Sequence, residues 1–351
     1  MTELAVQLVT ISPEEEGQRL DNFLLKWAKG VPKSHIYRII RSGEVRINKK
    51  RALVTSRILS GDIIRIPPIR IAIPEIVPNA HKNTLNAIKI DKNLSILHED
   101  DHLLIVDKPS GLAVHGGSGI SLGLIEALRE ARPELKFLEL VHRLDRDTSG
   151  ILMLAKKRLC LTTLHEDIRE GRMDKRYLFV AHGDFDGGLG HVSLKYPLYK
   201  YLLPNGERRV KVEDFGQASL TTIKWLGSSF QGRCFVGEAQ LKTGRTHQIR
   251  VHLASEGFPI AGDDKYGDFD LNKSLQRASA GLPLKRMFLH AWRLQCRHPV
   301  SNAPMHLEAG LPADLMAFLF AQLPHALPPP ADAVVAQSES GLDVSPSNST
   351  P

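Results

Sequence analysis

Residues 142–155 read His-Arg-Leu-Asp-Arg-Asp-Thr-Ser-Gly-Ile-Leu-Met-Leu-Ala, a charged turn that leads straight into an apolar, strand-like run. Asp145 lies directly between Arg143 and Arg146, and Asp147 follows. Nearby positive charge favours the ionised form of a carboxyl group even where substrate excludes water. Such a carboxylate is suited to attack an electrophilic carbon or to stabilise a cation. An isolated turn of this kind is more often a structural ion pair, so its meaning depends on the rest of the chain.

The positive charge of the chain is concentrated in one segment. The 351 residues are 42% hydrophobic and 24% charged, with a formal net charge of +7. Residues 17–70 contain 13 Lys or Arg against Asp21, Glu44 and Asp62, which gives this segment a net charge of +10. The length allows two domains with a sizeable core. The density of positive charge favours a polyanionic partner over a merely solvated face.

The cysteines and the apolar runs indicate a cytoplasmic protein. Cys160, Cys234 and Cys296 lie far apart with no C-x-x-C spacing, so a disulfide framework or a zinc site is not expected. The first 16 residues carry four glutamates and no basic residue, unlike a secretory signal. No apolar run approaches the roughly 18 residues that a membrane span needs.

Residues 17–70 predict a compact module of two helices followed by basic strands. Apolar residues recur at helical spacing over 20–27, and a second helix is expected with Ser34 as its N-cap. Strand-like patterns follow at 45–47 and 63–66. This order resembles the S4-type RNA-binding domain, which implies that basic side chains of the module bind RNA. The expected RNA contacts are Lys33, Arg38, Arg41 and Arg46.

The rest of the chain predicts one larger α+β domain. Its strand-like runs cluster with only occasional helices between them, which favours a mixed, largely antiparallel sheet over a doubly wound one. The expected divisions are an N-terminal extension at 1–16, the module at 17–70, a linker at 71–95, the larger domain at 96–325 and a disordered tail at 326–351.

A second segment of interest, 242–252, reads Lys-Thr-Gly-Arg-Thr-His-Gln-Ile-Arg-Val-His. A strand at 234–241 leads through Gly244 into an apparent helix, on which His247 and Arg250 share one face. The helix N-terminus and these basic groups could hold a phosphate or a catalytic carboxylate, and a basic surface helix explains the pattern equally well.

Other kinds of chemistry find little support. The Gly-Gly-Ser-Gly run at 116–119 lacks the order of a P-loop, so a flexible loop is favoured over a phosphate cradle. The 15 histidines show no metal-ligand spacing, and no G-x-S-x-G serine hydrolase motif is present. We expect neither a cofactor nor a metal.

Four stretches resemble the RluA-type ribosomal large-subunit pseudouridine synthases, and most of all their RluC group. They are DKPSGLAVHGGSG at 107–119, FLELVHRLDRDTSGILMLAKK at 137–157, KRYLFV at 175–180 and TGRTHQIRVHL at 243–253. The resemblance covers about residues 10 to 325, and the H-R-L-D-x-x-T-S-G string is its most specific part. It implies a pseudouridine synthase domain that acts on ribosomal RNA in the cytoplasm as a monomer.

The resemblance also implies roles for individual residues. Asp145 would be the catalytic aspartate, and Arg143 would take the place of the flipped uridine in the RNA stack. Tyr177 would stack on the target base and could take up the C5 proton, and Arg250 would form an ion pair with Asp145. His142 and His247 would contact the substrate.

The chemistry of uridine isomerisation agrees with these roles. The N1–C1′ bond breaks, the base turns, and C5 bonds to C1′, so no redox partner or energy donor is needed. The reaction needs an ionised carboxylate, a dry pocket and an extruded base. Whether Asp145 attacks C1′, adds to C6 or removes the 2′ proton stays open. The alternatives are a synthase acting on other rRNA or tRNA uridines, a non-catalytic RNA-binding assembly factor, and an RNA N-glycosylase.

Overall fold

A computed structural model describes residues 5–69, 80–116, 122–183, 191–228, 234–277 and 283–322. The expected tail at 326–351, most of the glycine run at 116–119 and residues 71–79 of the expected linker lie outside these ranges. Among the described helices, none combines the length and the apolar character needed to cross a membrane.

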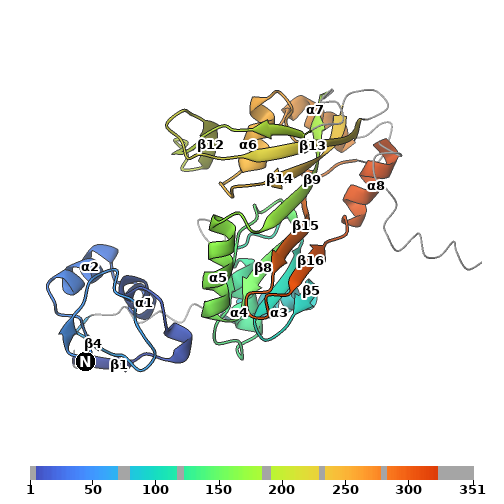
Figure 1. The fold of residues 1–351 in the computed structure, drawn as a ribbon. Helices are drawn as coiled ribbons and strands as arrows, with labels where there is room; N and C mark the ends of the chain where they lie inside the picture. Colours follow the sequence, from blue (N-terminus) through green and yellow to red (C-terminus); the bar gives the residue numbers. More distant parts are fainter. Residues whose placement is uncertain are drawn as a thin grey trace, which may run out of the picture. The chain divides into compact units, whose positions relative to one another are not determined.

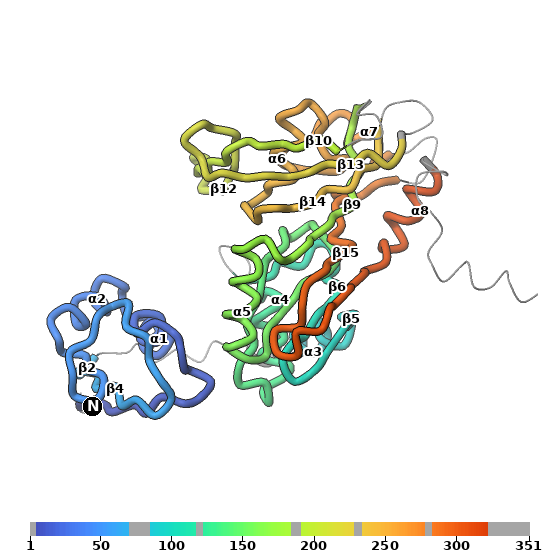
Figure 2. The backbone as a smooth tube through the Cα atoms, viewed as in Figure 1, coloured from blue at the N-terminus to red at the C-terminus, as the bar shows by residue number. Residues whose placement is uncertain are grey.

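The N-terminal module, blue in Figures 1 and 2, combines two helices with a small sheet. Strands β1 (Gln7–Thr10), β2 (Arg46–Ile47), β3 (Lys50–Arg51) and β4 (Ile63–Ile66) pair in the order β1-β4-β2-β3. A short 3-10 helix (Pro13–Glu15) precedes helices α1 (Leu20–Trp27) and α2 (Lys33–Arg41). The apolar stripes of both helices form the core with Val45, Ile64 and Ile66: Leu20, Phe23, Leu24, Ile36, Ile39 and Ile40.

Two details of the module differ from the sequence prediction. Gln7–Thr10, expected in an N-terminal extension, pair antiparallel with β4 as an edge strand of the module. The strand is mostly exposed and therefore lacks the alternating pattern of a half-buried one. Helix α2 begins at Lys33 after Pro32, so Ser34 belongs to its first turn and is not the N-cap.

Helix α3 (Ala80–Lys92) lies where the sequence predicted only a linker. It packs against α4 (Leu124–Ala131). Ala87 is fully buried, whereas the larger Leu85 and Ile88 are exposed. Over residues 85–92, where the side chains are described, the fully buried position is thus a small residue, and two of the large apolar residues face outward, so this part of the helix shows no clear apolar stripe.

The chain divides into two compact units. The first has the bounds Met1–Arg176 and His290–Gly310, and the second contains Tyr177–Leu289 and the described residues from Leu311 onward. In the first unit, the strands of the larger domain follow the order β15-β8-β6-β5, with β16 on β15 and β7 on β8. Their bounds are β5 (Ser95–Glu99), β6 (Leu103–Lys108), β7 (Glu139–Leu140), β8 (Ser149–Ala155), β15 (Leu289–Arg297) and β16 (Pro304–Glu308). Helix α5 (Arg158–Arg169) contributes Cys160 and Leu164 to their core.

The second unit carries strands in the order β10-β13-β14-β9 and a separate hairpin, β11-β12. The strands are β9 (Asp174–His182), β10 (His191–Leu194), β11 (Leu198–Leu202), β12 (Arg208–Val212), β13 (Thr221–Ser228) and β14 (Cys234–Leu241), and the helices are α6 (Gln248–Ser255), α7 (Phe269–Arg277) and α8 (Ala313–Gln322). β8 pairs with β15 in parallel, whereas β6 with β8 and β13 with β14 are antiparallel. The expected α+β fold with a mixed, largely antiparallel sheet is confirmed.

Candidate active site

Asp145 lies in the loop between β7 and β8, in the first unit. Its side chain is half-buried, and its carbonyl oxygen accepts the Thr148 N–H at 3.3 Å, which closes the turn before β8. Asp145 thus lies in the turn that leads into an entirely buried strand.

A buried lysine holds this loop from the neighbouring strand end. Lys108 is fully buried, and its Nζ donates to the carbonyl oxygens of Pro109 (2.8 Å), Leu112 (2.8 Å) and Arg146 (2.9 Å). The Gly111 N–H donates to the same Arg146 carbonyl at 2.9 Å. The backbone next to Asp145 is thus fixed by the Asp-Lys-Pro-Ser-Gly segment, a role that the sequence pattern did not reveal for Lys108.

The Thr-Ser-Gly part of the motif shapes the start of β8. Gly150 has a φ of +109°, and a Cβ there would lie 2.2 Å from the Ala291 carbonyl oxygen, so a side chain cannot be accommodated. The Ser149 hydroxyl lies 2.9 Å from His290 Nδ1 within the buried interior. These contacts fix the strand that begins shortly after Asp147.

The other charged residues of the turn have different surroundings. Arg146 Nε lies 3.1 Å from Asp147 Oδ1, and the Asp147 carbonyl accepts the Ser110 hydroxyl at 2.8 Å. Arg143 is exposed. The ion pair and the backbone contact give Asp147 the structural role of a turn residue.

His142 contributes to the packing of the loop. Its Nε2 accepts the Met153 N–H at 3.2 Å, which ties the loop to β8. Burial, helped by the positive charge of Lys175, lowers the pKa of His142 to about 3, so the ring is neutral at physiological pH. Burial also lowers the pKa of Lys175 itself. The expected substrate contact by His142 stays a prediction, and the geometry shows a structural role.

Tyr177 and Arg250 belong to the second unit. Tyr177 lies in β9 and is 6% exposed. Arg250 lies in α6, whose residues from Gln248 to Leu253 are all buried, so this segment is not a basic surface helix. Gln248 ties the preceding loop down, because its Oε1 accepts the Thr243 hydroxyl at 2.8 Å and the Arg245 N–H at 3.0 Å.

Arg250 has a buried acidic partner that the sequence did not indicate. Its Nε donates to Asp263 Oδ2 and its Nη2 to Asp263 Oδ1, each at 2.7 Å. The side chains of Arg250 and Asp263 are 3% and 0% exposed. Burial alone would raise the pKa of Asp263, but the hydrogen bonds and charge of Arg250 outweigh burial and lower it. The prediction that Arg250 pairs with Asp145 stays a prediction.

His247 is held by a tyrosine from the same loop as Asp263. His247 caps α6 in a left-handed conformation, with a φ of +53°, and so does not share a helical face with Arg250. The Tyr266 hydroxyl oxygen accepts the Val210 N–H at 2.9 Å and lies 2.8 Å from His247 Nδ1. Burial raises the pKa of Tyr266 to about 12, so the hydroxyl keeps its proton.

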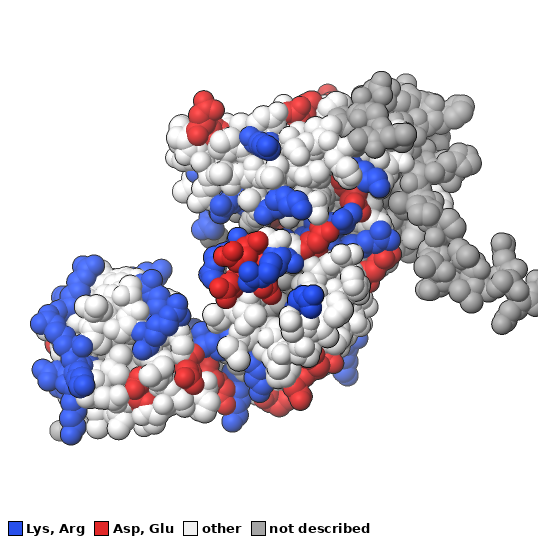
Figure 3. All heavy atoms as spheres, viewed as in Figure 1, with Lys and Arg blue, Asp and Glu red and all other residues white. Residues whose placement is uncertain are grey.

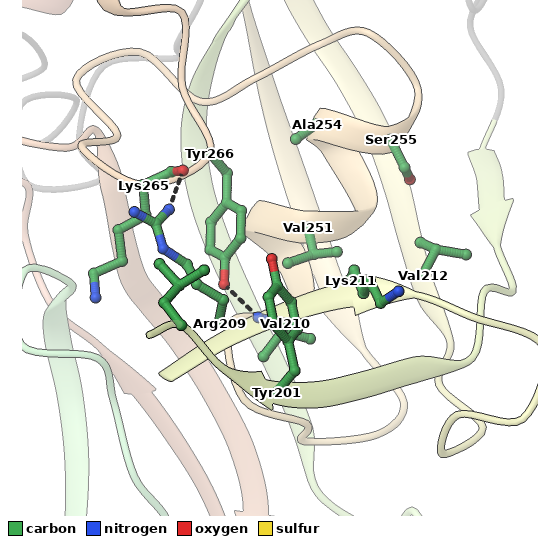
Figure 4. A pocket seen from close by; sticks show the side chains of 11 residues that line it. Tyr201, Arg209, Val210, Lys211, Val212, Val251, Ala254, Ser255, Lys265 and Tyr266 are labelled. Carbon is green, nitrogen blue, oxygen red and sulfur yellow. Dashed lines mark hydrogen bonds between the residues drawn. The ribbon is translucent and has the colours of Figure 1, made fainter. Parts of the chain in front are cut away.

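Tyr266 also lines a pocket of about 420 Å³ between the β11-β12 hairpin and α6. Figure 4 shows that Tyr266, Tyr201 and three valines line this pocket together with the basic side chains of Arg209, Lys211 and Lys265. Arg209 donates to the Lys265 carbonyl, and Lys265 Nζ lies 2.6 Å from Glu207 Oε1. Arg209 and Lys265 therefore both have partners within the protein. Their contacts link the β11-β12 hairpin to the loop that contains Asp263.

The four expected RNA contacts of the N-terminal module are all exposed: Lys33, Arg38, Arg41 and Arg46. Figure 3 shows Lys and Arg side chains gathering on this module. Arg38 Nη1 lies 3.7 Å from Glu44 Oε1, with both side chains solvent-accessible, so the ion pair is weak. The charge of the module is therefore available to a polyanion.

The described residues include only Gly116 of the glycine run at 116–119, and the amide of this residue already has an acidic partner. Gly116, at the start of the run, donates its N–H to the Glu126 carboxylate at 3.0 Å, and Gly123 does so at 3.1 Å. The Glu126 carboxylate thus accepts from both of these described amides. The described part of the chain contains no group of three or more His, Cys, Asp or Glu placed to hold a metal ion.

Comparison with known proteins identifies the class. Residues 102–255 match the family described as RNA pseudouridylate synthase, and residues 18–64 match the S4 domain. A structure titled human RNA pseudouridylate synthase domain containing 4 is similar, with a TM-score of 0.53 and 25% identity, covering 68% of this chain and 96% of that one.

Two curated relatives are more similar in sequence. The ribosomal large subunit pseudouridine synthase C of Yersinia pestis is 49% identical over 90% of this chain and 95% of its own length. The protein of the same name from Escherichia coli (strain K12) is 48% identical over 87% and 93%. The chain belongs to the RNA pseudouridine synthase family and carries an N-terminal S4 domain.

Proposed function

We propose that this protein isomerises specific uridines of large-subunit ribosomal RNA to pseudouridine, with Asp145 as the catalytic carboxylate. The observation that carries the proposal is the fixed position of the Asp145 loop. Lys108, Gly111 and Ser110 bond its backbone at Arg146 and Asp147, and Gly150 fixes the strand that follows. Catalytic groups need such a preorganised frame. The names of the two curated relatives support the choice of RNA.

The proposed roles of the other residues follow from the family motifs and from their surroundings. The target uridine is extruded from the RNA, and exposed Arg143 fills its place in the stack. Buried Tyr177 stacks on the base. Arg250, oriented by Asp263, pairs with Asp145 and keeps it ionised in a site from which water is excluded.

The reaction balances without a cofactor. The N1–C1′ bond breaks, C5 bonds to C1′, and the proton on C5 is lost while N1 gains one. We propose that catalysis is metal-free and that the protein works as a monomer in the cytoplasm. The exposed basic residues of the S4 domain would supply affinity for phosphates rather than chemistry.

Release of tritium from RNA labelled at C5 of uridine tests the proposal. Purified protein incubated with labelled large-subunit rRNA should release tritium to water, and the RNA should then contain pseudouridine. Free uracil would instead indicate an N-glycosylase. Binding without tritium release, on rRNA and on tRNA, would indicate an RNA-binding assembly factor and contradict the proposal.

A further inference from the structure

We infer that Asp263 is a positioning residue, which fixes the guanidinium of Arg250 in the orientation that catalysis requires. The inference rests on the proposed function, in which Arg250 acts on Asp145. It adds a residue from the loop between helices α6 and α7 that none of the motifs singled out. The basis is the geometry of the buried pair and of its supports.

Arg250 and Asp263 form a bidentate ion pair. Two nitrogens of Arg250 each meet one oxygen of Asp263 at 2.7 Å, so the guanidinium plane and the carboxylate plane are locked together. A buried ion pair contributes little net stability, because desolvation offsets the attraction. Its clear effect here is to define where the guanidinium points.

Asp263 is itself held firmly. Its Oδ1 also accepts the N–H groups of Lys265 at 2.8 Å and Tyr266 at 3.0 Å. The Asn272 side chain donates to the Asp263 carbonyl at 2.9 Å and accepts the Gly262 N–H at 2.7 Å. Gly262 has a φ of +77°, and a Cβ there would lie 2.2 Å from the Arg286 carbonyl oxygen. The loop is therefore built for one conformation.

Tyr266 supports the guanidinium from another side. The Cζ atom of Arg250 lies 5.2 Å from the centre of the Tyr266 ring, within the range of a cation–π contact. The same ring is anchored by its hydroxyl to the β12 backbone and to His247. Figure 4 shows this anchoring from β12. Arg250 thus sits between a carboxylate and an aromatic ring that belong to one loop.

The neighbouring Asp264 provides a matched control. Its side chain is 60% exposed, and its Oδ1 lies 3.5 Å from Arg250 Nη2. An exposed contact at this distance contributes little. Asp263 and Asp264 are the same residue type at adjacent positions, and only Asp263 binds the guanidinium with both oxygens.

The test measures single-turnover tritium release from a folded rRNA fragment, together with RNA affinity and melting temperature. Asp263→Asn should lower the chemical rate by roughly 10²-fold, as expected for a misplaced group, with little change in RNA affinity. Asp263→Glu should recover part of the loss. Asp264→Asn should stay within about twofold of the parent, since it removes only an exposed contact.

A double-mutant cycle separates positioning from a general structural role. If Asp263 acts through Arg250, adding Asp263→Asn to Arg250→Ala should cause no further loss of rate. The double variant should also melt at a higher temperature than Arg250→Ala alone, which leaves a buried charge unpaired. This comparison remains informative even if Asp263→Asn by itself folds poorly.

The outcomes are distinguishable. Wild-type rates in Asp263→Asn, or a further loss when it is added to Arg250→Ala, would overturn the positioning role. An inactive parent protein would instead contradict the proposed function.

Discussion

Asp145 and Asp147 are two residues apart, and we propose different roles for them. Asp147 pairs with Arg146, and its carbonyl is held by Ser110. Asp145 is half-buried in the same loop and heads the turn before β8. The sequence pattern left a structural ion pair open for both residues, and Asp147 forms one with Arg146.

At Arg250, two substitutions separate charge from geometry. Arg250→Ala should lower the single-turnover rate by several powers of ten, because in the proposed mechanism the guanidinium supplies the positive charge that acts on Asp145. Arg250→Lys should recover part of the rate, since the charge remains although the fork is lost. Rates are to be compared below the melting temperature of each variant, because an unpaired Asp263 costs roughly 3–5 kcal/mol of stability. A near-parental rate in Arg250→Ala would contradict this role.

At the scale of elements, the sequence predicted the helices and strands that have a clear apolar pattern of their own. Helices α1 and α2 and strands β8 and β14 lie where the apolar periodicity indicated. Strand β1 and helix α3 were missed. The first is an exposed edge strand, and the second buries a small residue, Ala87, while larger apolar residues face outward. Neither produces the period that a sequence reveals.

In the candidate site, the sequence pointed to residues that lie in local motifs and missed those that only the fold brings together. Asp145, Tyr177 and Arg250 stand in recognisable motifs. Lys108 is 38 residues from Arg146, and Asp263 is 13 from Arg250. Only the fold brings these partners together, because no local spacing rule relates them. The sequence offered two signals for these partners. Lys108 ends an apolar strand, and Asp263 stands in the segment Gly-Asp-Asp-Lys-Tyr-Gly at 262–267.

At the scale of the whole molecule, affinity and chemistry should be separable. Replacing Lys33, Arg38, Arg41 and Arg46 together with Gln should leave the fold intact, since all four are exposed. RNA binding should weaken, and the slope of log affinity against log salt should become shallower by about 0.7 to 0.9 for each phosphate that the protein no longer neutralises. The rate of tritium release at saturating RNA should stay close to the parent. An unchanged salt slope would show that the S4 domain does not contact phosphates through these residues.

The central claim is that Asp145 carries the chemistry, and one comparison tests it most directly. Single-turnover tritium release is measured for the parent, Asp145→Asn and Asp147→Asn on the same RNA, with RNA affinity determined in parallel. Asp145→Asn is nearly isosteric but uncharged, so it should abolish release while RNA affinity stays nearly intact. Asp147→Asn should cost little beyond the stability of the turn. Parental rates in Asp145→Asn, or loss of activity in Asp147→Asn alone, would contradict the account.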